Sequence, residues 1–268
     1  MTNPYAAIER GHPGRIGWRI FYFDRLGSTQ QAAGELAARG AAQGTVVIAE
    51  AQEAGRGRLG RTWYSPAGKN LYATVILRPN ALALSQVASL SLAAGIAVAE
   101  TLERFAPGEV ALKWPNDIWL SRRKAGGLIA EAIVAPDQRL QYVLLGVGLN
   151  LNLAENDIPE DLRWRATSVL AATGQRCDRV GVADELFARL ETRYREHAKS
   201  GFAGLKPTYD RYCALKGKKV SVVAGGQPRS GLVLGVDETG ALLLEVGASV
   251  DRILAGDVSV ESAYEEGV

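Results

Sequence analysis

Apolar residues recur with two different periods along the first half of the chain, and these periods predict strands and helices in alternation. Runs rich in β-branched and aromatic residues predict strands over 18–23, 45–49 and 71–77. Between the first two runs, Ser28 is typical of a helix N-cap and Gly40 of a helix end. We therefore expect a helix over 30–39.

Small and apolar residues at helical spacing over 84–105 predict a long, largely buried helix. Further strands are expected over 110–113, 118–120, 128–134 and 142–151. The strand over 110–113 is interrupted at 115–117 and resumes over 118–120, and residues 121–123 make a hairpin turn. Helical patterns return between 167 and 212, where 182–197 is amphipathic. The pattern predicts a mixed sheet flanked by helices, which is an α+β fold.

The pattern of apolar and turn-forming residues changes after Lys216. Short apolar runs now alternate with Gly-Gly, Pro and Asp-Glu-Thr-Gly turns, and they cover 220–223, 232–236, 242–246 and 253–260. This spacing predicts a small all-β barrel of about fifty residues. We place the boundary near Leu215, which divides the chain into a large domain (1–214) and a small one (215–268).

Composition narrows the classes of function. A chain of 268 residues suits one large and one small domain, and 47% hydrophobic with 22% charged residues is ordinary for a globular protein. The formal net charge of +2 gives little overall attraction to nucleic acid or anionic lipid, so anion binding has to come from a local basic cluster. No apolar run reaches the ~20 residues of a membrane helix, and the N-terminus lacks the apolar segment of a secretory signal.

The cysteines and histidines are isolated in the sequence. Cys177 and Cys213 form no disulfide framework, which fits a reducing cytoplasm. With only His12 and His197 beside them, we expect no metal site built from Cys and His. His197 falls in a helical segment, and we expect it at the protein surface.

A loop dense in glycine and arginine, residues 52–69 (hereafter the Gly-Arg loop), is the sharpest feature. It alternates Gly55, Gly57 and Gly60 with Arg56, Arg58 and Arg61. Glycines let backbone N–H groups approach an anion, and guanidinium groups suit phosphate or carboxylate. Three cations so close together repel one another, so we expect the free loop to be mobile and to become ordered when an anion binds. A solvated basic loop is the alternative.

A second cluster surrounds the predicted hairpin. Lys113 ends a strand, Asn116 and Asp117 follow, and Lys124 stands across the turn before Gly127. Two lysines and one aspartate fit a phosphoryl-transfer pocket, and a glycine in the next strand lets a ligand lie against the backbone. An ordinary hairpin with Pro, Asn and Asp in its turns is an equally open alternative.

A third piece is Asn150 in the apolar segment GVGLNLN, residues 146–152. A polar side chain in an apolar strand needs a partner. That partner is either local backbone or a bound base or phosphate.

Together these pieces resemble the biotin–protein ligases. The Gly-Ser-Thr-Gln entry, GRGRLGR, KWPND, the K-x-G-G strand and GVGLNLN occur in that family's order and at about its spacing over 18–152, and the C-terminal barrel is similar to its SH3-like domain. The resemblance implies a core like that of class II aminoacyl-tRNA synthetases. It also implies that ATP activates biotin to biotinyl-5'-AMP with release of diphosphate, after which biotin is transferred to a lysine of a biotin carboxyl carrier protein. We expect Mg²⁺ to arrive with ATP.

The resemblance and the residue chemistry together assign three sets of site residues. The expected biotin contacts are Ser28, Thr29, Gln30, Gln52, Arg56, Gly57, Arg58, Lys124 and Gly127. The expected nucleotide contacts are Arg58, Arg61, Trp63, Lys113, Asn116 and Asn150. The expected catalytic residues are Lys124, which would bridge the biotin carboxylate and the α-phosphate, Arg58, and Asp117, which would meet the acceptor lysine.

Two departures from the family pattern change the expectation. Gln30 stands where the family usually has Asn, so we expect retained but adjusted biotin binding. Only about seventeen residues precede the first predicted strand, too few for the helix-turn-helix of the regulatory members, so we expect no repressor function.

Two other functions compete with this interpretation. A lipoate–protein ligase is similar in fold and reaction, but its loop lacks the paired Gly-Arg alternation. A nucleic-acid-binding module would use the loop arginines on phosphates, but the small net charge and the lack of an aromatic platform motif weaken it. We therefore expect neither nucleic acid nor membrane as a partner, and the frequency of dimers among such enzymes favours a homodimer.

Overall fold

The computed structural model describes residues 2–79 and 82–260, and its largest element is a seven-stranded mixed sheet. The strand order is β1-β2-β3-β7-β6-β5-β4, in which β1 and β2 are parallel and the other neighbours are antiparallel. The strands are β1 (Arg19–Leu26), β2 (Thr45–Gln52), β3 (Leu71–Leu77), β4 (Val110–Lys113), β5 (Asp117–Leu120), β6 (Arg123–Val134) and β7 (Leu140–Leu149).

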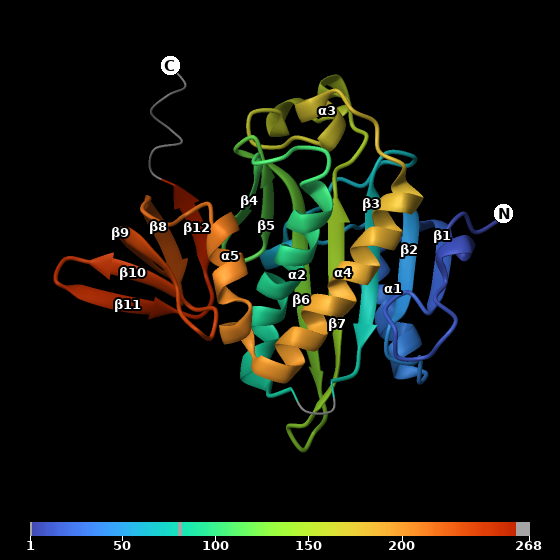
Figure 1. Cartoon of the computed structure of the whole chain (residues 1–268), viewed down its shortest axis with the longest axis horizontal. Coiled ribbons are helices and arrows are strands. Elements are labelled where there is room, and N and C mark those ends of the chain that lie inside the picture. Colours follow the sequence, from blue (N-terminus) through green and yellow to red (C-terminus); the bar gives the residue numbers. More distant parts are fainter. Residues whose placement is uncertain (1, 80–81, 261–268) are drawn as a thin grey trace.

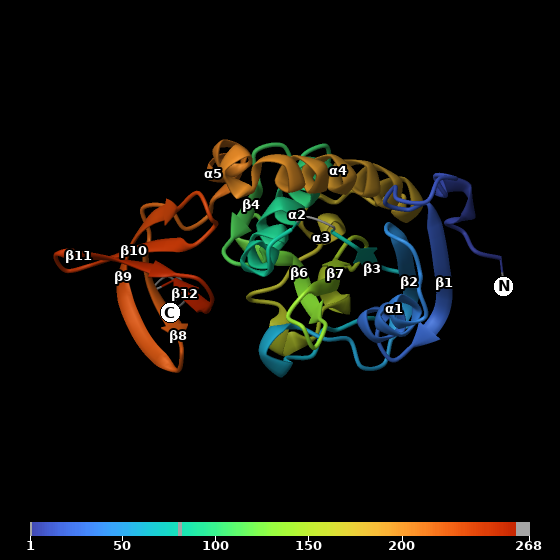
Figure 2. The same ribbon diagram turned by 90° about the horizontal axis from the view of Figure 1, so that it is seen from below.

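Helices cover both faces of this sheet (Figures 1 and 2). On one face α1 packs against β2, β3 and β7, and on the other face α2 lies on β6 with α4 packed against it. The helices are α1 (Thr29–Ala38), α2 (Val87–Leu102), α3 (Val169–Thr173), α4 (Arg179–Ser200) and α5 (Lys206–Tyr212). The predicted helix-flanked mixed sheet is confirmed. The predicted helix over 84–105 is a 3₁₀ turn (Leu84–Gln86) followed by α2.

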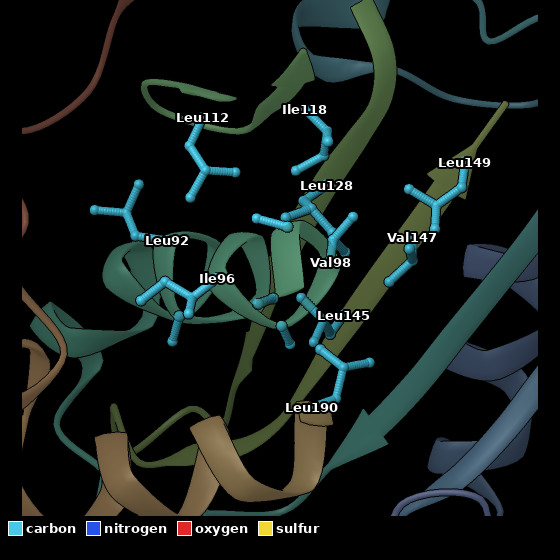
Figure 3. Close-up of a cluster of buried hydrophobic side chains, with 14 of the residues drawn as sticks. Leu92, Ile96, Val98, Leu112, Ile118, Leu128, Leu145, Val147, Leu149 and Leu190 are labelled. Atoms are coloured by element: carbon cyan, nitrogen blue, oxygen red, sulfur yellow. The ribbon is translucent and has the colours of Figure 1, made fainter. Parts of the chain in front are cut away.

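The strand β7 shows how the sheet separates its two faces. Leu145, Val147 and Leu149 pack into the apolar layer around α2 (Figure 3). Side chains alternate along a strand, so Gly146 and Gly148 face the opposite side, where α1 lies. At these two positions the α1 face carries no side chain, which leaves room above the strand.

The stretch Leu84–Leu102 has the length and mean hydropathy (1.3) of a membrane span, and in the part of the chain that the structure describes it is the one helix that does. Sixty-seven per cent of it is buried inside the protein, between the sheet and α4. It is therefore the central helix of the core, as the burial of Ile96 and Val98 illustrates in Figure 3.

The C-terminal region forms a separate antiparallel sheet with the order β11-β10-β9-β8-β12. Its strands are β8 (Lys219–Ala224), β9 (Gln227–Val236), β10 (Leu242–Val246), β11 (Ser249–Ile253) and β12 (Asp257–Val260). The prediction of one continuous run over 253–260 is wrong, because the chain turns at Leu254–Gly256 between β11 and β12. This sheet docks on the larger one through Trp114, which is 2% exposed and donates from Nε1 to the carbonyl oxygen of Gly240 at 3.0 Å.

The expectation that His197 lies at the surface is also wrong. The side chain is fully buried, and its Nε2 lies 2.8 Å from the Oγ of Ser89. Because α4 packs along α2, the helix face that carries His197 is turned toward the interior. Burial lowers the pKa of this imidazole to about 4.

Candidate active site

A cavity opens on the α1 face of the large sheet, above the bare stretch of β7. Segments distant in the sequence form its wall: the N-terminus of α1, the end of β2, the Gly-Arg loop, and strands β3, β6 and β7. All nine residues that were predicted to contact biotin line it: Ser28, Thr29, Gln30, Gln52, Arg56, Gly57, Arg58, Lys124 and Gly127. Of the predicted nucleotide contacts, Arg58, Trp63 and Asn116 line it as well.

The N-terminus of α1 forms the polar end of the cavity. Ser28 caps the helix by accepting from the backbone N–H of Gln30 at 3.2 Å. The backbone N–H and the Oγ1 of Thr29 both donate to Oε1 of Gln52, at 2.9 and 3.1 Å. Gln52 in turn donates from Nε2 to the Oγ of Ser65 at 3.0 Å. These bonds hold several amide and hydroxyl groups in fixed orientations at the positive end of a helix.

Thr74 completes this end, although the sequence analysis did not select it. It is fully buried on β3, with its Oγ1 2.9 Å from Oγ1 of Thr29 and 3.1 Å from Oε1 of Gln30. Gln30 also donates from Nε2 to the carbonyl oxygen of Leu144 at 3.2 Å. A Cβ on Gly146, the cross-strand partner of Thr74, would lie 2.7 Å from the Gln30 oxygen. The longer Gln side chain therefore fits because β7 has a glycine beneath it.

Two paired glycines form the surface against which the indole of Trp63 packs. Gly127 and Gly148 are direct partners on β6 and β7. A Cβ on Gly148 would lie 2.8 Å from the indole, and one on Gly127 would lie 3.4 Å from it. The ammonium group of Lys124 lies 5.3 Å from the indole ring centroid, within the range of a cation–π interaction. The glycine alternation in GVGLN and K-x-G-G was the signal that could have indicated this bare surface.

Lys124 is paired with Asp117. The Nζ of Lys124 lies 2.6 Å from Oδ1 of Asp117, and both side chains are partly buried. Asp117 and Lys113 do not line the main cavity, but with Asn116 they line a smaller hollow beside it. Burial lowers the pKa of Lys113, and the nearby Asp117 opposes that shift.

The Gly-Arg loop lies over the cavity and is held by its own backbone. The N–H of Gly57 donates to the carbonyl oxygen of Arg61 at 2.7 Å, and that of Trp63 donates to Gly55 at 2.8 Å. The Gly57 N–H is therefore used inside the loop, whereas we expected the glycine N–H groups to be available to an anion.

The two arginines at positions 58 and 61 reach different partners. Arg58 donates to Oδ1 of Asn116 at 3.0 Å and to the carbonyl oxygen of Gly256 at 3.4 Å, and burial lowers its pKa. Arg61 does not line the cavity, because its guanidinium forms an ion pair with Asp257 of the C-terminal sheet. The mutual repulsion that we expected among the loop cations is reduced by this carboxylate.

Asn150 lies just beyond the end of β7 and does not line the cavity. Its Nδ2 donates to the carbonyl oxygen of Thr167 at 3.0 Å, and its Oδ1 accepts from Asn70 at 3.4 Å. The sequence left open local backbone or a bound group as the partner, and the structure shows protein groups that are distant in the sequence instead. A contact between Asn150 and a nucleotide stays a prediction.

No group of three or more His, Cys, Asp and Glu side chains that could hold a metal ion occurs in residues 2–79 and 82–260. Asp117, which lies beside the cavity, is already paired with Lys124. The cavity wall carries guanidinium, ammonium, amide and hydroxyl groups, which are suited to bind an anion.

The sequence of the chain is similar to known protein ligases. Residues 22–150 match the biotin/lipoate A/B protein ligase family, and residues 217–260 match the biotin protein ligase C-terminal domain. The chain is 36% identical over 245 residues to the bifunctional ligase/repressor BirA of Bacillus subtilis, covering 91% of this chain and 75% of that protein. It is 35% identical to the biotin–[acetyl-CoA-carboxylase] ligase of Mycobacterium tuberculosis, covering 90% and 89%.

The fold is similar as well. The biotin protein ligase from Aquifex aeolicus in complex with biotin and ATP superposes with a TM-score of 0.77 at 29% identity, covering 90% of this chain and 97% of that one. The similarities in sequence and in fold both point to the same family. The chain belongs to the biotin–protein ligase family.

Proposed function

We propose that the cavity beside α1 is the site at which this ligase binds biotin and ATP, forms biotinyl-5'-AMP, and passes biotin to a lysine of a biotin carboxyl carrier protein. The observation that carries this proposal is the convergence of all nine predicted biotin residues on one cavity. Arg56 and Arg58 of the Gly-Arg loop and Lys124 of β6 line the same cavity. Two of the chain's relatives are named biotin–[acetyl-CoA-carboxylase] ligase, which favours biotin over lipoate as the substrate.

The polar end of the cavity suits the ureido ring of biotin. A ureido group has two N–H donors and one carbonyl acceptor, and the cluster of Ser28, Thr29, Gln30 and Gln52 offers both kinds of partner. The sulfur-containing ring and the valeryl chain would lie along the parts of β6 and β7 that line the cavity. This orientation directs the biotin carboxylate toward Lys124.

The first step joins two anions. A carboxylate oxygen of biotin attacks the α-phosphorus of ATP, the new O–P bond forms, and the bond to diphosphate breaks. Negative charge increases on the phosphoryl oxygens, so fixed cations accelerate the step. Lys124 and Arg58 are placed to supply them. We propose that Mg²⁺ enters as part of the MgATP substrate, where it neutralises the triphosphate.

The second step transfers the acyl group. The neutral amine of the carrier lysine attacks the acyl carbon, the C–N bond forms, and AMP leaves with the electrons of the C–O bond. An amine with a pKa of ~10.4 is mostly protonated at neutral pH, so a nearby base has to take its proton. Asp117, at the edge of the cavity, is our candidate for this role and for orienting the amine.

The Gly-Arg loop has the position of a lid. Biotinyl-5'-AMP is a mixed anhydride that water destroys, so exclusion of water protects it. Trp63, at the base of the loop, has a buried Nε1 without a partner among the described residues, and a bound nucleotide would supply one. Arg61, Lys113 and Asn150 are proposed to complete the nucleotide site around this indole.

The wider arrangement is also a proposal. We divide the chain into a catalytic domain of 1–214 and an SH3-like domain of 215–268, acting in the cytoplasm as a homodimer without a nucleic-acid partner. Light scattering on the purified protein tests the dimer. A single-subunit mass at micromolar concentration would contradict it.

The function is tested by mixing the protein with biotin, MgATP and an unmodified biotin carboxyl carrier domain, then weighing the carrier. We expect one biotinyl group on one lysine, and none when ATP is left out. A parallel reaction with lipoate tests the competing substrate. An unmodified carrier with biotin, or a preference for lipoate, would contradict the proposal.

A further inference from the structure

We propose that Gly256 and Asp257 of the C-terminal sheet are the anchor that positions the Gly-Arg loop over the cavity, and that Asp257 is a positioning residue for Arg61 and Arg58. The inference rests on the proposed function, because it assigns the C-terminal sheet a part in nucleotide binding at the same site. It predicts that the loop is placed from outside the catalytic domain.

The anchor joins two arginines to one dipeptide. The guanidinium of Arg61 forms an ion pair with the carboxylate of Asp257. One residue earlier, the carbonyl oxygen of Gly256 accepts from Arg58 at 3.4 Å, while Arg58 also donates to Asn116 at the cavity wall. Arg58 thus bridges the cavity and the C-terminal sheet.

The anchor itself is held firmly. Asp257 begins β12 and pairs with Val223 of β8. Gly256 lies so close to β8 that a Cβ there would come within 2.9 Å of the Val223 carbonyl oxygen. A dipeptide packed in this way cannot move independently of its sheet, so the position of the whole sheet decides where the arginines are held.

The position of that sheet is set by the same motif that borders the active site. Trp114 of KWPND is buried and donates to Gly240, and Gly240 is pressed against α2 so closely that a Cβ would lie 2.7 Å from Leu92. The motif therefore supplies Lys113, Asn116 and Asp117 to the site and also docks the sheet that anchors the loop.

Contacts from outside the loop add to its own backbone hydrogen bonds. Leu59 lies between the two anchored arginines with φ of 56° and ψ of 34°, a left-handed conformation that is unfavourable for a residue with a side chain. The residue is 72% exposed, so burial does not compensate. The hydrogen bond from the Gly57 N–H to Arg61 closes the loop around it, and the anchored arginines on both sides support the same conformation from outside.

Asp257 can hold Arg61 without preventing nucleotide binding. A guanidinium has several N–H donors, so Arg61 can bind a phosphate oxygen while it stays on the carboxylate. Asp257 therefore preorganises the loop cations, and removing it should weaken nucleotide binding. If Asp257 instead competed with phosphate for Arg61, removing it would strengthen nucleotide binding.

The test is Asp257→Asn in the full chain, with Asp251→Asn as the matched control. Asp251 lies in the same sheet and pairs with Arg229, away from the loop. For Asp257→Asn we expect the KM for MgATP to rise about two- to fivefold, the size of an exposed ion pair. Trypsin should cleave after Arg58 and Arg61 faster in the ligand-free variant. Asp251→Asn should match wild type in both measurements.

Two further variants keep the test decisive. In an Arg61→Gln background, Asp257→Asn should change the KM for MgATP less than it does alone, because the shared contact is already lost. Asp257→Glu keeps the charge and should restore part of the wild-type KM. An unchanged or lower KM in Asp257→Asn, with unchanged trypsin cleavage, would overturn the anchor. Failure of the wild-type protein to bind biotin would instead overturn the proposed function.

Discussion

The ammonium group of Lys124 lies 2.6 Å from the carboxylate of Asp117, across the hairpin formed by β5 and β6. The indole ring of Trp63 lies 5.3 Å from the same ammonium group. These two contacts fix the position of the cation that we propose for the biotin carboxylate and the α-phosphate. The ion pair also places Asp117 beside that cation, consistent with its proposed role in orienting the incoming lysine.

Replacing Lys124 by alanine should reduce turnover strongly. A fixed cation that meets developing negative charge is worth about 10²–10³ in rate, so we expect a loss of that size in biotin-dependent exchange of diphosphate with ATP. Lys69→Ala is the matched control, since Lys69 has similar exposure and pairs with Asp157 outside the cavity. Turnover near wild type in Lys124→Ala would remove Lys124 from the catalytic residues.

Replacing Arg58 by alanine should open the lid. The variant loses the link between Asn116 and Gly256, so biotinyl-5'-AMP should escape into solution before it meets the carrier. Chromatography of the filtrate measures the released adenylate. Arg139→Ala, in the exposed turn between β6 and β7, serves as control and should release no more than wild type. An unchanged amount of free adenylate in Arg58→Ala would contradict the lid.

Ligands should protect the Gly-Arg loop from trypsin. Biotin and MgATP bring anions to the loop arginines, which reduces the mobility that cleavage requires. Mass spectrometry of fragments after Arg56, Arg58 and Arg61 measures the rate, and cleavage after the exposed Arg229 of β9 provides the internal control. Equal cleavage of the loop with and without both ligands is the result that counts against ordering.

Adding one methyl group at Gly148 should disturb nucleotide binding. In Gly148→Ala the new Cβ would lie 2.8 Å from the Trp63 indole, so the ring has to move away from β7. We expect a higher KM for MgATP and a changed tryptophan fluorescence spectrum. Gly34→Ala is the control, because Gly34 lies in α1 and its Cβ would lie 3.4 Å from Leu144 of β7, an ordinary van der Waals contact. An unchanged KM in Gly148→Ala would show that the Trp63 position does not matter for ATP.

The buried His197 should make stability fall in acid. Burial lowers its folded-state pKa to about 4, from an ordinary value of 6.5, so the unfolded state binds more protons between these two pH values. The contribution is present above pH 6.5 and is lost as the pH falls toward 4, by up to about 3 kcal/mol at ~1.4 kcal/mol per pKa unit.

Urea unfolding at several pH values measures this loss. His197→Gln removes the titrating ring and should flatten the dependence between pH 6.5 and 4, whereas replacing the exposed His12 by glutamine should leave it as in wild type. An equally steep acid loss in His197→Gln would assign the effect to other groups.

Local chemistry explains why much of the site was predictable. GRGRLGR and KWPND each concentrate charged and turn-forming residues within a few positions, so their chemistry is visible without knowing the fold. Their spacing along alternating strand and helix patterns was also enough to predict the helix-flanked sheet. The four-strand interpretation of the C-terminal region was less accurate, because the short turn at Leu254–Gly256 lies in an almost continuous apolar run.

Contacts between distant segments could not be predicted in this way. Thr74 faces Gly146 only because of the register between β3 and β7, and that register is set by packing of the whole sheet. The interior position of His197 depends on how α4 packs on α2. Neither the pairing of Thr74 with Gly146 nor the burial of His197 can be predicted from the residues next to them in the sequence.

The sequence by itself determined the family and the order of the elements, and it indicated the residues proposed to bind an anion and a ureido group, because these follow from short-range patterns and side-chain chemistry. Only the tertiary structure decided that Arg61 pairs with Asp257, that Lys124 pairs with Asp117, and that glycines form the floor beneath Gln30 and Trp63. Strand register and the docking of the second sheet bring these groups together, and both are properties of the packed molecule.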